Sequence, residues 1–352
     1  MRRRMVSACL AVALLCSLLC FASCKEGLQK FTAQSFACFD TVTTVTGYAT
    51  SREEFDRVSG EIFSSLEEYH RLYQIYESYE GVVNLYAVNA LEDGIHPTLQ
   101  VDARILQLLQ FSKEAYDLTH GRVNVAMGSV LRLWHEARER AQLNPEEASL
   151  PSMEALQAAA AHTDIDQLLL DPAVGTVRLL DPGMTLDVGA IAKGYAVEQV
   201  ARALEEKGIT GYLINAGGNI RTVGVKGNGE AWTVGIEDPT GASKDGCLAY
   251  LSLTGESLVT SGSYQRFYTV EGKNYHHVID PTTRMPATYY TSVSVVCRSS
   301  ALADALSTAL FCMSPEEGMA LVDSLEGVEA LWVLTDGSQR TSHGFAQYLK
   351  AT

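Results

Sequence analysis

Residues 211–236 read GYLINAGGNIRTVGVKGNGEAWTVGI. The apolar runs at 211–215 and 232–236 are separated by turns rich in Gly and Asn, a pattern typical of strands joined by tight turns. The NAGGN segment at 215–219 looks like a nucleotide-binding glycine loop, but it leads into another strand and not into a helix. A Rossmann assignment requires a helix at that point, so this stretch argues against a doubly wound sheet.

The rest of the chain mixes further strands with long helices. Apolar residues from Phe55 to Tyr73 recur every three or four positions, which predicts a long amphipathic helix. A second helix is predicted over about 102–119, with Asp102 as its cap. Further helices are predicted at 190–207, 301–313 and 315–325, and further strands at 36–49, 176–180, 248–253 and 292–296. Without regular βαβ alternation, this mixture predicts an α+β fold with mostly antiparallel sheets and packed helices.

The first 23 residues have the pattern of an export signal. Three arginines at 2–4 precede an uncharged apolar run at 5–21, and Ala22-Ser23-Cys24 follows. A cysteine at the cut resembles a bacterial lipoprotein signal, in which Cys24 carries lipid and begins the mature chain. We therefore expect a lipid-anchored membrane protein on the extracytoplasmic face, at the outer face of the cytoplasmic membrane or in the periplasm. The alternative is an ordinary cleaved signal in which Cys24 is incidental.

The mature chain is expected to hold one large domain or two tightly joined lobes over 36–350, behind a short tether at 24–35. The charged, Ala-rich segment at about 136–161, broken by Pro145 and Pro151, is predicted to be a peripheral helical insertion.

Charge and cysteine content exclude several classes of protein. Removal of residues 1–23 takes away three of 27 basic residues and none of 42 acidic ones, so the formal charge becomes −18. Binding to nucleic acid is disfavoured, because it needs a clustered basic surface. Cys38, Cys247, Cys297 and Cys312 are widely spaced, without a CxxC pair. Neither a zinc site nor a disulfide framework is indicated, and we expect core thiols.

Three separated stretches carry chemistry suited to a metal-bound diphosphate: DVGAIAKG at 187–194, HVIDP at 277–281 and DALST at 304–308. Asp187 precedes a predicted helix, whose free amide groups attract anions, and Lys193 adds a positive charge. Asp304 and Thr308 are four apart, so they share one helix face. Both are hard oxygen donors of the kind that Mg²⁺ accepts while it keeps waters and binds substrate phosphates.

Each stretch also has a structural explanation. Asp187 is able to cap the helix while Lys193 stays solvated, and Thr308 is able to bond a backbone carbonyl beside a surface Asp304. His277 has three open roles: a base, a phosphate donor or a structural hydrogen-bonder.

Taken together, the motifs resemble the ApbE family of FAD:protein FMN transferases, over about residues 36–346. The matching motifs are DxGxxAKG at 187–194, INxGG at 214–218, SGxYxR at 261–266, HxIDPxT at 277–283 and ADAxST at 303–308. In the N-terminal half, the stretch from Tyr79 to Asn89 looks like the family's segment near the adenine, and 121–128 followed by Trp134 looks like its next element. Arg284 in place of a glycine, Gln265 in place of an acid and Asn124 in place of an aspartate depart from the family pattern.

The resemblance implies a T-fold-like α+β domain that clamps FAD between two lobes. It implies that Asp304, Thr308 and the Ala190 carbonyl hold Mg²⁺. The FAD contacts that it implies are Phe39, Tyr79, Arg122, Val123, Asn124, Asp187, Lys193 and Val278. His277 is the candidate base, with Asp280 as the alternative, and Lys193 is the candidate for charge neutralisation.

The reaction implied is the transfer of FMN from FAD to a Thr or Ser hydroxyl of an acceptor flavoprotein, with release of AMP. The acceptors implied are flavoprotein subunits of membrane redox complexes. Two alternatives stay open: a hydrolase that splits FAD to FMN and AMP, and a lipoprotein that only binds flavin.

Overall fold

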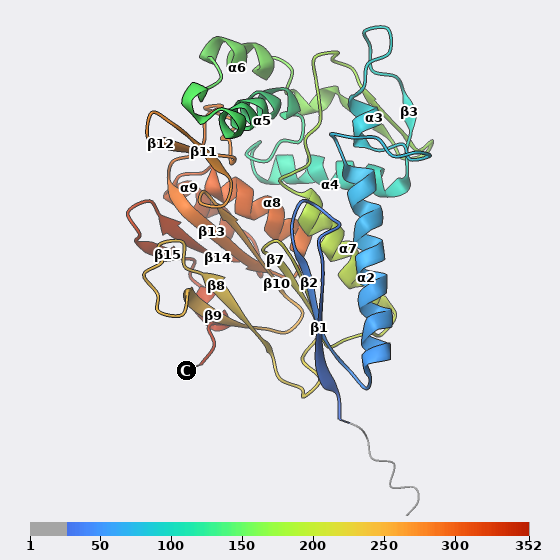
Figure 1. Ribbon diagram of the computed structural model, residues 1–352, viewed down its shortest axis with the longest axis vertical. Coiled ribbons are helices and arrows are strands. Elements are labelled where there is room, and N and C mark those ends of the chain that lie inside the picture. The colour runs from blue at the N-terminus through green and yellow to red at the C-terminus, as the bar shows by residue number, and fades with distance from the viewer. Residues whose placement is uncertain (1–26, 352) are drawn as a thin grey trace, which may run out of the picture.

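A single eight-stranded sheet forms the centre of the protein, whose computed structural model describes residues 27–351. Its strands are β1 (Gln29–Ser35), β2 (Thr43–Ala49), β6 (Tyr212–Ala216), β7 (Asn219–Val223), β10 (Ser257–Gly262), β13 (Tyr290–Cys297), β14 (Glu329–Leu334) and β15 (Gln339–Thr341). Their order is β1-β2-β6-β7-β10-β13-β14-β15 (Figure 1). Every pairing in this sheet is antiparallel, which confirms the predicted fold class.

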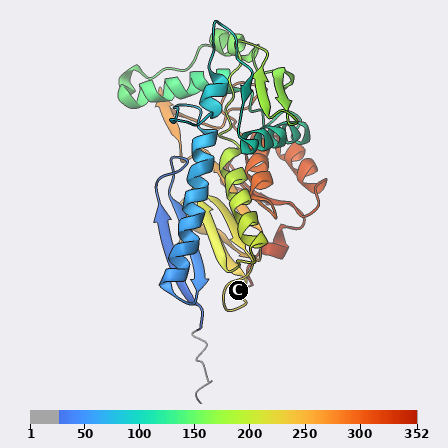
Figure 2. The ribbon, with the colours of Figure 1, turned by 90° about the vertical axis from the view of Figure 1, so that its right-hand side faces the viewer.

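Three helices pack against the sheet: α2 (Arg52–Tyr73), α7 (Ala192–Glu206) and α8 (Ser300–Phe311). In Figure 2, α2 and α7 run side by side in front of the sheet. The periodic apolar residues of α2 face inward, with Phe55, Ile62 and Leu66 fully buried. Its N-cap is Ser51, whose side chain accepts a hydrogen bond from the Glu54 N–H. The periodic apolar residues therefore predicted this helix correctly.

A separate hairpin, β8 (Trp232–Glu237) and β9 (Cys247–Leu253), forms a second small core with the sheet. Trp232, Val234 and Leu251 from the hairpin pack with Leu258 and Val333 from the sheet.

The remaining elements lie in the upper part of Figure 1, apart from α9 and η3, which follow α8 in the chain. They are α3 (Leu85–Asn89), β3 (Leu99–Gln100), α4 (Ala103–Leu118), α5 (Gly128–Leu143), η1 (Pro145–Glu147), α6 (Met153–Ala160), η2 (Ile165–Gln167), β4 (Leu168–Asp171), β5 (Thr176–Leu179), β11 (Phe267–Val270), β12 (Lys273–His276), α9 (Pro315–Asp323) and η3 (Phe345–Tyr348). The predicted cap of α4 is confirmed, since the Asp102 carboxylate accepts from the Arg104 N–H at 2.9 Å. Within the described residues, no helix has the length and apolar character needed to cross a bilayer.

The predicted strand at 36–49 is wrong in its first half. The strands are β1 and β2, paired from Gln29↔Ala49 to Ser35↔Thr43, and residues 36–42 form the connection. Phe39 and Asp40 in this connection have φ of 56° and 50°, in the left-handed region that helps to reverse the chain. Residues 29–35 therefore belong to the sheet, and the expected tether over 24–35 extends too far into the domain.

The segment at 136–161 is helical as predicted, in α5 and α6, but its first helix begins earlier than expected. Helix α5 begins at Gly128 and buries Trp134 in a core shared with Tyr268 and Ile279. The sequence placed the start of this helix too late, because the charged residues of α5 lie only on the side that faces solvent.

All four cysteines in the described chain are free. Cys38, Cys297 and Cys312 are buried, as expected of core thiols, whereas Cys247 is only partly buried. The signal segment and Cys24 lie outside the described residues.

Candidate functional site

The three motif stretches, far apart in sequence, line one cleft. The first supplies Asp187, Gly189, Ala190 and Lys193, the second supplies His277, Val278, Ile279 and Pro281, and the third supplies Asp304 and Thr308. Antiparallel strands bring the turn between β6 and β7 to the same place, so that Gly217 and Asn219 also line the cleft.

Asp304 is a buried carboxylate at the base of this cleft, with 4% of its surface exposed. Its Oδ2 accepts a hydrogen bond from the Gly194 N–H at 2.7 Å. Burial raises the pKa of Asp304, and the charge of Lys193, the Gly194 N–H and the Asn219 side chain oppose that rise. A buried carboxylate with so little compensation favours a cation beside it.

The donor set fits Mg²⁺ better than zinc. Thr308 lies one turn after Asp304 on α8, and its hydroxyl makes no hydrogen bond within the described chain, so it is not committed to a backbone carbonyl. The described residues contain no group of three or more His, Cys, Asp or Glu side chains placed to hold a metal. One carboxylate, one hydroxyl and the Ala190 carbonyl suit an ion that completes its shell with water and phosphate oxygens.

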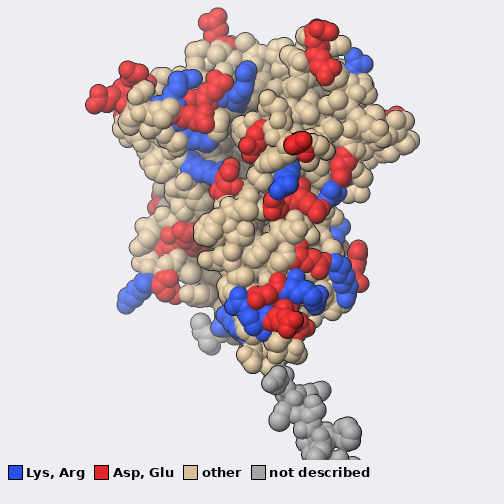
Figure 3. All heavy atoms as spheres, turned by 45° about the vertical axis from the view of Figure 1, so that its right-hand side comes forward, with Lys and Arg blue, Asp and Glu red and all other residues tan. Residues whose placement is uncertain are grey.

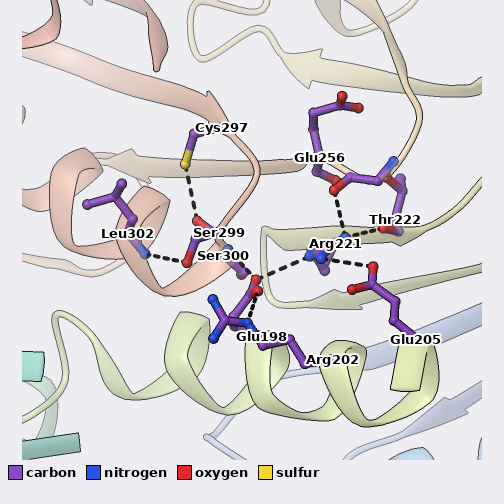
Figure 4. A network of polar contacts seen from close by, with 11 residues as sticks. Glu198, Arg202, Glu205, Arg221, Thr222, Glu256, Cys297, Ser299, Ser300 and Leu302 are labelled. Carbon is purple, nitrogen blue, oxygen red and sulfur yellow. Dashed lines mark hydrogen bonds and ion pairs between the residues drawn. The ribbon is translucent and has the colours of Figure 1, made fainter. Parts of the chain in front are cut away.

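Helices α7 and α8 cap each other at this point. The first amide groups of a helix have no partner within it. Asp304 of α8 accepts from the amide of Gly194, the third residue of α7, while Glu198 of α7 accepts from the amide of Ser300, the first residue of α8, at 2.8 Å. Figure 4 shows Glu198 at the centre of a polar network between α7, β7 and the start of α8. Its ion-pair partners are Arg202 at 2.8 Å and Arg221 at 3.1 Å, and Arg221 also contacts Glu205 at 3.0 Å.

Gly194 is required by the close approach of these two helices. A Cβ atom there would lie 2.4 Å from the Asp304 Cβ and 2.4 Å from the Ser300 carbonyl oxygen. The glycine of the AKG sequence therefore sets the distance between α7 and the face of α8 that carries Asp304.

A second, smaller compartment joins the cleft at Asp187, Gly189 and Lys193. Phe39 lines it, and its N–H donates to the His70 Nδ1 at 3.2 Å. Other residues that line it include His70, Tyr73, Tyr76 and Arg266. Lys193 thus stands where the two compartments meet.

Asp187 does not cap the helix that follows it. Its Oδ1 accepts from the Gly189 N–H at 2.8 Å, and α7 begins at Ala192 without a side-chain cap. Burial raises the pKa of Asp187, opposed by the Gly189 N–H and the nearby His135 and Arg138.

Cations gather at the cleft although the protein is acidic. On the face shown in Figure 3, basic side chains lie among acidic ones instead of forming a band of their own. The basic side chains that line the cleft are Arg122, Arg138, Lys193 and Arg266, against the carboxylates Asp187 and Asp304. A locally positive cleft attracts an anionic ligand such as a diphosphate.

The two adjacent histidines differ in their surroundings. His276 is held on both ring nitrogens, with Nε2 2.8 Å from the Ala287 carbonyl and Nδ1 accepting from the Val278 N–H. His277 is open to solvent within the cleft, and its Nδ1 lies 3.2 Å from the Arg266 carbonyl. Desolvation by the cleft wall, together with the nearby charges of Arg266 and Lys193, lowers the pKa of His277 to about 4. It is therefore a neutral imidazole at physiological pH.

Asp280 is not available as a base. It is 8% exposed, and its Oδ1 accepts from the Thr282 N–H at 2.9 Å and from Arg122 at 3.2 Å. Arg122 lines the cleft but also donates to Thr282 and to the Cys312 carbonyl, so it ties the turn to the end of α8. The structure thus gives the pair a structural role and leaves His277 as the candidate base.

Val123 and Asn124 also line the cleft, but their polar groups make hydrogen bonds to other protein atoms. The Asn124 amide donates to the Thr163 carbonyl at 2.8 Å, and its oxygen accepts from the Ala126 N–H. Val278 is 6% exposed, and its carbonyl accepts from the Ala287 N–H. These residues shape the wall by packing.

Tyr79 lies outside both compartments, contrary to its predicted place beside the ligand. Its hydroxyl donates to Glu77 at 2.9 Å, and the Arg71 guanidinium lies over its ring. Tyr76 lines both compartments instead and stacks on His135 at 5.1 Å between ring centroids. The sequence missed Tyr76, His135 and Arg138; the only signal for the last two was their shared helix face at 134–138.

Arg284 occupies a position that favours glycine. Its φ is 62°, and its N–H donates to the Asp280 carbonyl at 2.7 Å, which closes the turn. Its carbonyl accepts from the Trp134 Nε1 at 2.9 Å. Arg284 therefore keeps the turn, although a left-handed backbone costs a non-glycine residue about 1–2 kcal/mol of conformational free energy.

The protein is an antiparallel α+β domain whose two-compartment cleft is lined by more basic than acidic side chains. Comparison with known proteins identifies its family. The ApbE family matches residues 39–332. A FAD:protein FMN transferase of Treponema pallidum is 34% identical over 312 residues, 84% of this chain and 83% of that protein. One from Klebsiella pneumoniae is 32% identical over 75% of this chain and 81% of its own length. The chain therefore belongs to the ApbE family.

Solved structures agree with this assignment. The ApbE protein of Thermotoga maritima superposes with a TM-score of 0.79 at 26% identity, over 92% of this chain and all of that one. The flavin transferase ApbE of Vibrio cholerae superposes with a TM-score of 0.73 at 25% identity, with the same coverage.

Proposed function

We propose that this protein is a Mg²⁺-dependent enzyme that transfers FMN from FAD to a Thr or Ser hydroxyl of an acceptor flavoprotein and releases AMP. The observation that carries the proposal is the meeting of two compartments at Asp187 and Lys193, beside the Asp304–Thr308 face. FAD has two ring systems joined by a diphosphate, so its shape and charge match this arrangement. Membership of a family with curated FAD:protein FMN transferases supports the same reaction.

In this reaction, the acceptor oxygen forms a bond to the FMN-side phosphorus as the bond to the AMP oxygen breaks, and AMP leaves with that electron pair. Such chemistry depends mainly on positioning and charge neutralisation. Lys193 supplies fixed positive charge where the compartments join. Asp304, Thr308 and the Ala190 carbonyl would hold Mg²⁺, which, when bound, withdraws charge from the diphosphate.

His277 is proposed to accept the proton of the acceptor hydroxyl. A base works in its unprotonated form, and the lowered pKa of about 4 keeps His277 unprotonated at all pH values well above 4. We expect kcat/KM to stay constant between pH 5.5 and 8. It should fall only at lower pH, as the pH approaches the pKa of His277. His277→Ala should reduce kcat about 10²- to 10⁴-fold.

This assignment is checked by the pH profile of AMP release in the presence of acceptor. An apparent pKa near 6.5 that disappears in His277→Ala would contradict a desolvated His277. Full activity of His277→Ala would remove its role as the base.

Transfer and hydrolysis differ only in whether a protein hydroxyl or water reaches the phosphorus. Tyr76, placed between the two compartments, is suited to stack on a ring of FAD and keep it intact until an acceptor binds. We expect slow AMP release from FAD alone and much faster release with an acceptor flavoprotein, whose mass should increase by FMN. Tyr76→Ala should raise release without acceptor, whereas Tyr79→Ala, outside both compartments, should not.

Mass spectrometry of the acceptor, together with AMP measurement, separates the alternatives. Equal AMP release with and without acceptor, free FMN and no flavinylated protein would establish the hydrolase. Bound FAD with no AMP would establish a flavin-binding protein.

We further propose that lipid on Cys24 anchors the protein on the extracytoplasmic face, where flavoprotein subunits of membrane redox complexes are its acceptors. Two acyl chains anchor stably where one does not, because each buried methylene contributes about 0.8 kcal/mol. Strand β1 leaves the domain at the end opposite α5 and α6 (Figure 1), so the cleft-bearing part would lie away from the membrane. Cys24→Ser should release the protein from membranes or block its maturation. Unchanged membrane fractionation of that variant would refute the lipid anchor.

A further inference from the structure

Asn219 is a buried cleft residue with no function in the scheme above. It is the first residue of β7, it is 2% exposed, and it lines the cleft. Its Nδ2 is buried and has no hydrogen-bond partner in the described part of the chain. Leaving a buried donor unpaired costs about 1–3 kcal/mol, so such a group calls for an explanation.

The backbone gives Asn219 little freedom to relieve this cost. Gly217 and Gly218 form the preceding turn with φ of 56° and 92°. The Gly218 N–H is fixed by the Asn215 Oδ1 at 3.0 Å. Asn219 itself is paired with Ala216 on one side and with Val259 on the other. Its side chain is therefore held at the cleft by two neighbouring strands.

Asp304 is the acceptor beside it. The Gly194 N–H donates to Oδ2 of Asp304, and Oδ1 accepts no hydrogen bond of normal geometry from the described residues. Helix α8 packs against β7, and Asp304 and Asn219 line the same cleft. A buried amide donor without a partner therefore shares this cleft with a carboxylate that needs to stay charged and oriented.

We propose that Asn219 is a positioning residue for the metal-binding carboxylate: its Nδ2 donates to Asp304 and, together with the Gly194 N–H, orients the carboxylate toward the cation. The inference rests on the proposed function, since it takes Asp304 as a Mg²⁺ ligand. Outer-shell partners of this kind typically change metal affinity 10- to 100-fold.

The test measures cation binding directly, apart from turnover. Mn²⁺ binding to the mature protein is followed by EPR titration and confirmed by competition with Mg²⁺, and FAD binding without metal is followed by flavin fluorescence. The variants are Asn219→Ala, Asn219→Ser, which keeps a shorter donor, and Asn219→Asp, which puts a like charge beside Asp304. Asn228→Ala is the matched control, because it removes an exposed amide from the turn after β7 and lies outside the cleft lining. Melting temperatures verify that each variant is folded.

We expect Asn219→Ala to weaken Mn²⁺ and Mg²⁺ binding about 10- to 100-fold, with FAD affinity unchanged within about twofold. Asn219→Ser should recover part of the loss, and Asn228→Ala should bind cations like the wild type. Unchanged cation affinity in Asn219→Ala overturns the proposal, as does an equal loss in Asn228→Ala. A loss of FAD affinity without metal also overturns it, because Nδ2 would then bind the substrate. If the wild type binds no cation, the metal role in the proposed function fails together with this inference; if the wild type binds and Asn219→Ala binds equally, only this inference fails.

Discussion

Asp304→Asn should reduce Mg²⁺-dependent FMN transfer by about a thousandfold or more, because it removes the buried carboxylate from the proposed metal-binding face. Losing a single neutral donor at a reacting centre already costs about 10²- to 10³-fold, and here a full charge is lost. Asparagine keeps an oxygen for the Gly194 N–H, which Asp304 binds at 2.7 Å, so the cap on α7 survives. Asp304→Ala should abolish activity, since it loses both the charge and the cap.

Thr308→Val should have a smaller effect, because it removes a neutral donor and leaves the carboxylate in place. Asp336→Asn is the matched control, since Asp336 is exposed in the turn between β14 and β15, away from the cleft. The measurement is the transfer rate against Mg²⁺ concentration for the wild type and all four variants. Full Mg²⁺-dependent turnover by Asp304→Asn would contradict the proposed metal site.

Gly194→Ala should cost about 1–3 kcal/mol of the free energy of unfolding and most of the activity. The added methyl group would meet the Asp304 Cβ and the Ser300 carbonyl oxygen, each at 2.4 Å, and neither is the end of a flexible side chain. Helices α7 and α8 must separate, which moves Asp304 away from Lys193. Urea unfolding and the transfer rate, measured on the same preparation, test both effects.

Gly60→Ala is the control for this substitution. Gly60 is an exposed residue of α2, and a Cβ there has nothing within 4 Å. Alanine should therefore stabilise the helix by about 0.5–1 kcal/mol, as its higher helix propensity requires. If Gly194→Ala is as stable and as active as the wild type, the close packing of α7 on α8 does not position the site.

Several features of the fold followed from local sequence patterns. Apolar residues repeating through Phe55, Ile62 and Leu66 gave α2, and Asp102 was correctly predicted as a cap. The glycine-rich segment at 215–219 was correctly assigned as a connection between strands, because its residues need left-handed backbone at Gly217 and Gly218. Such features depend on neighbours within a few residues, so the sequence carries them directly.

Errors arose where the deciding contacts are remote in sequence. Strand β1 was missed because its residues, half exposed at the edge of the sheet, carry little apolar signal and gain their structure from pairing with β2. The start of helix α5 was placed too late, because its buried face is defined by β11 and the turn near Ile279.

By itself, the sequence determined the fold class, the family motifs and the identities of the candidate ligands, because these depend on residue type and local spacing. Only the tertiary structure decided which of those residues share a cleft. It placed Asp304 against Gly194, committed Asp280 to Arg122, and put Tyr76 in place of Tyr79 between the two compartments. The physical reason is that burial, pairing and the direction of a side chain are set by the packing of elements far apart in the sequence, such as those that hold Arg122 and Asp280, which are 158 residues apart.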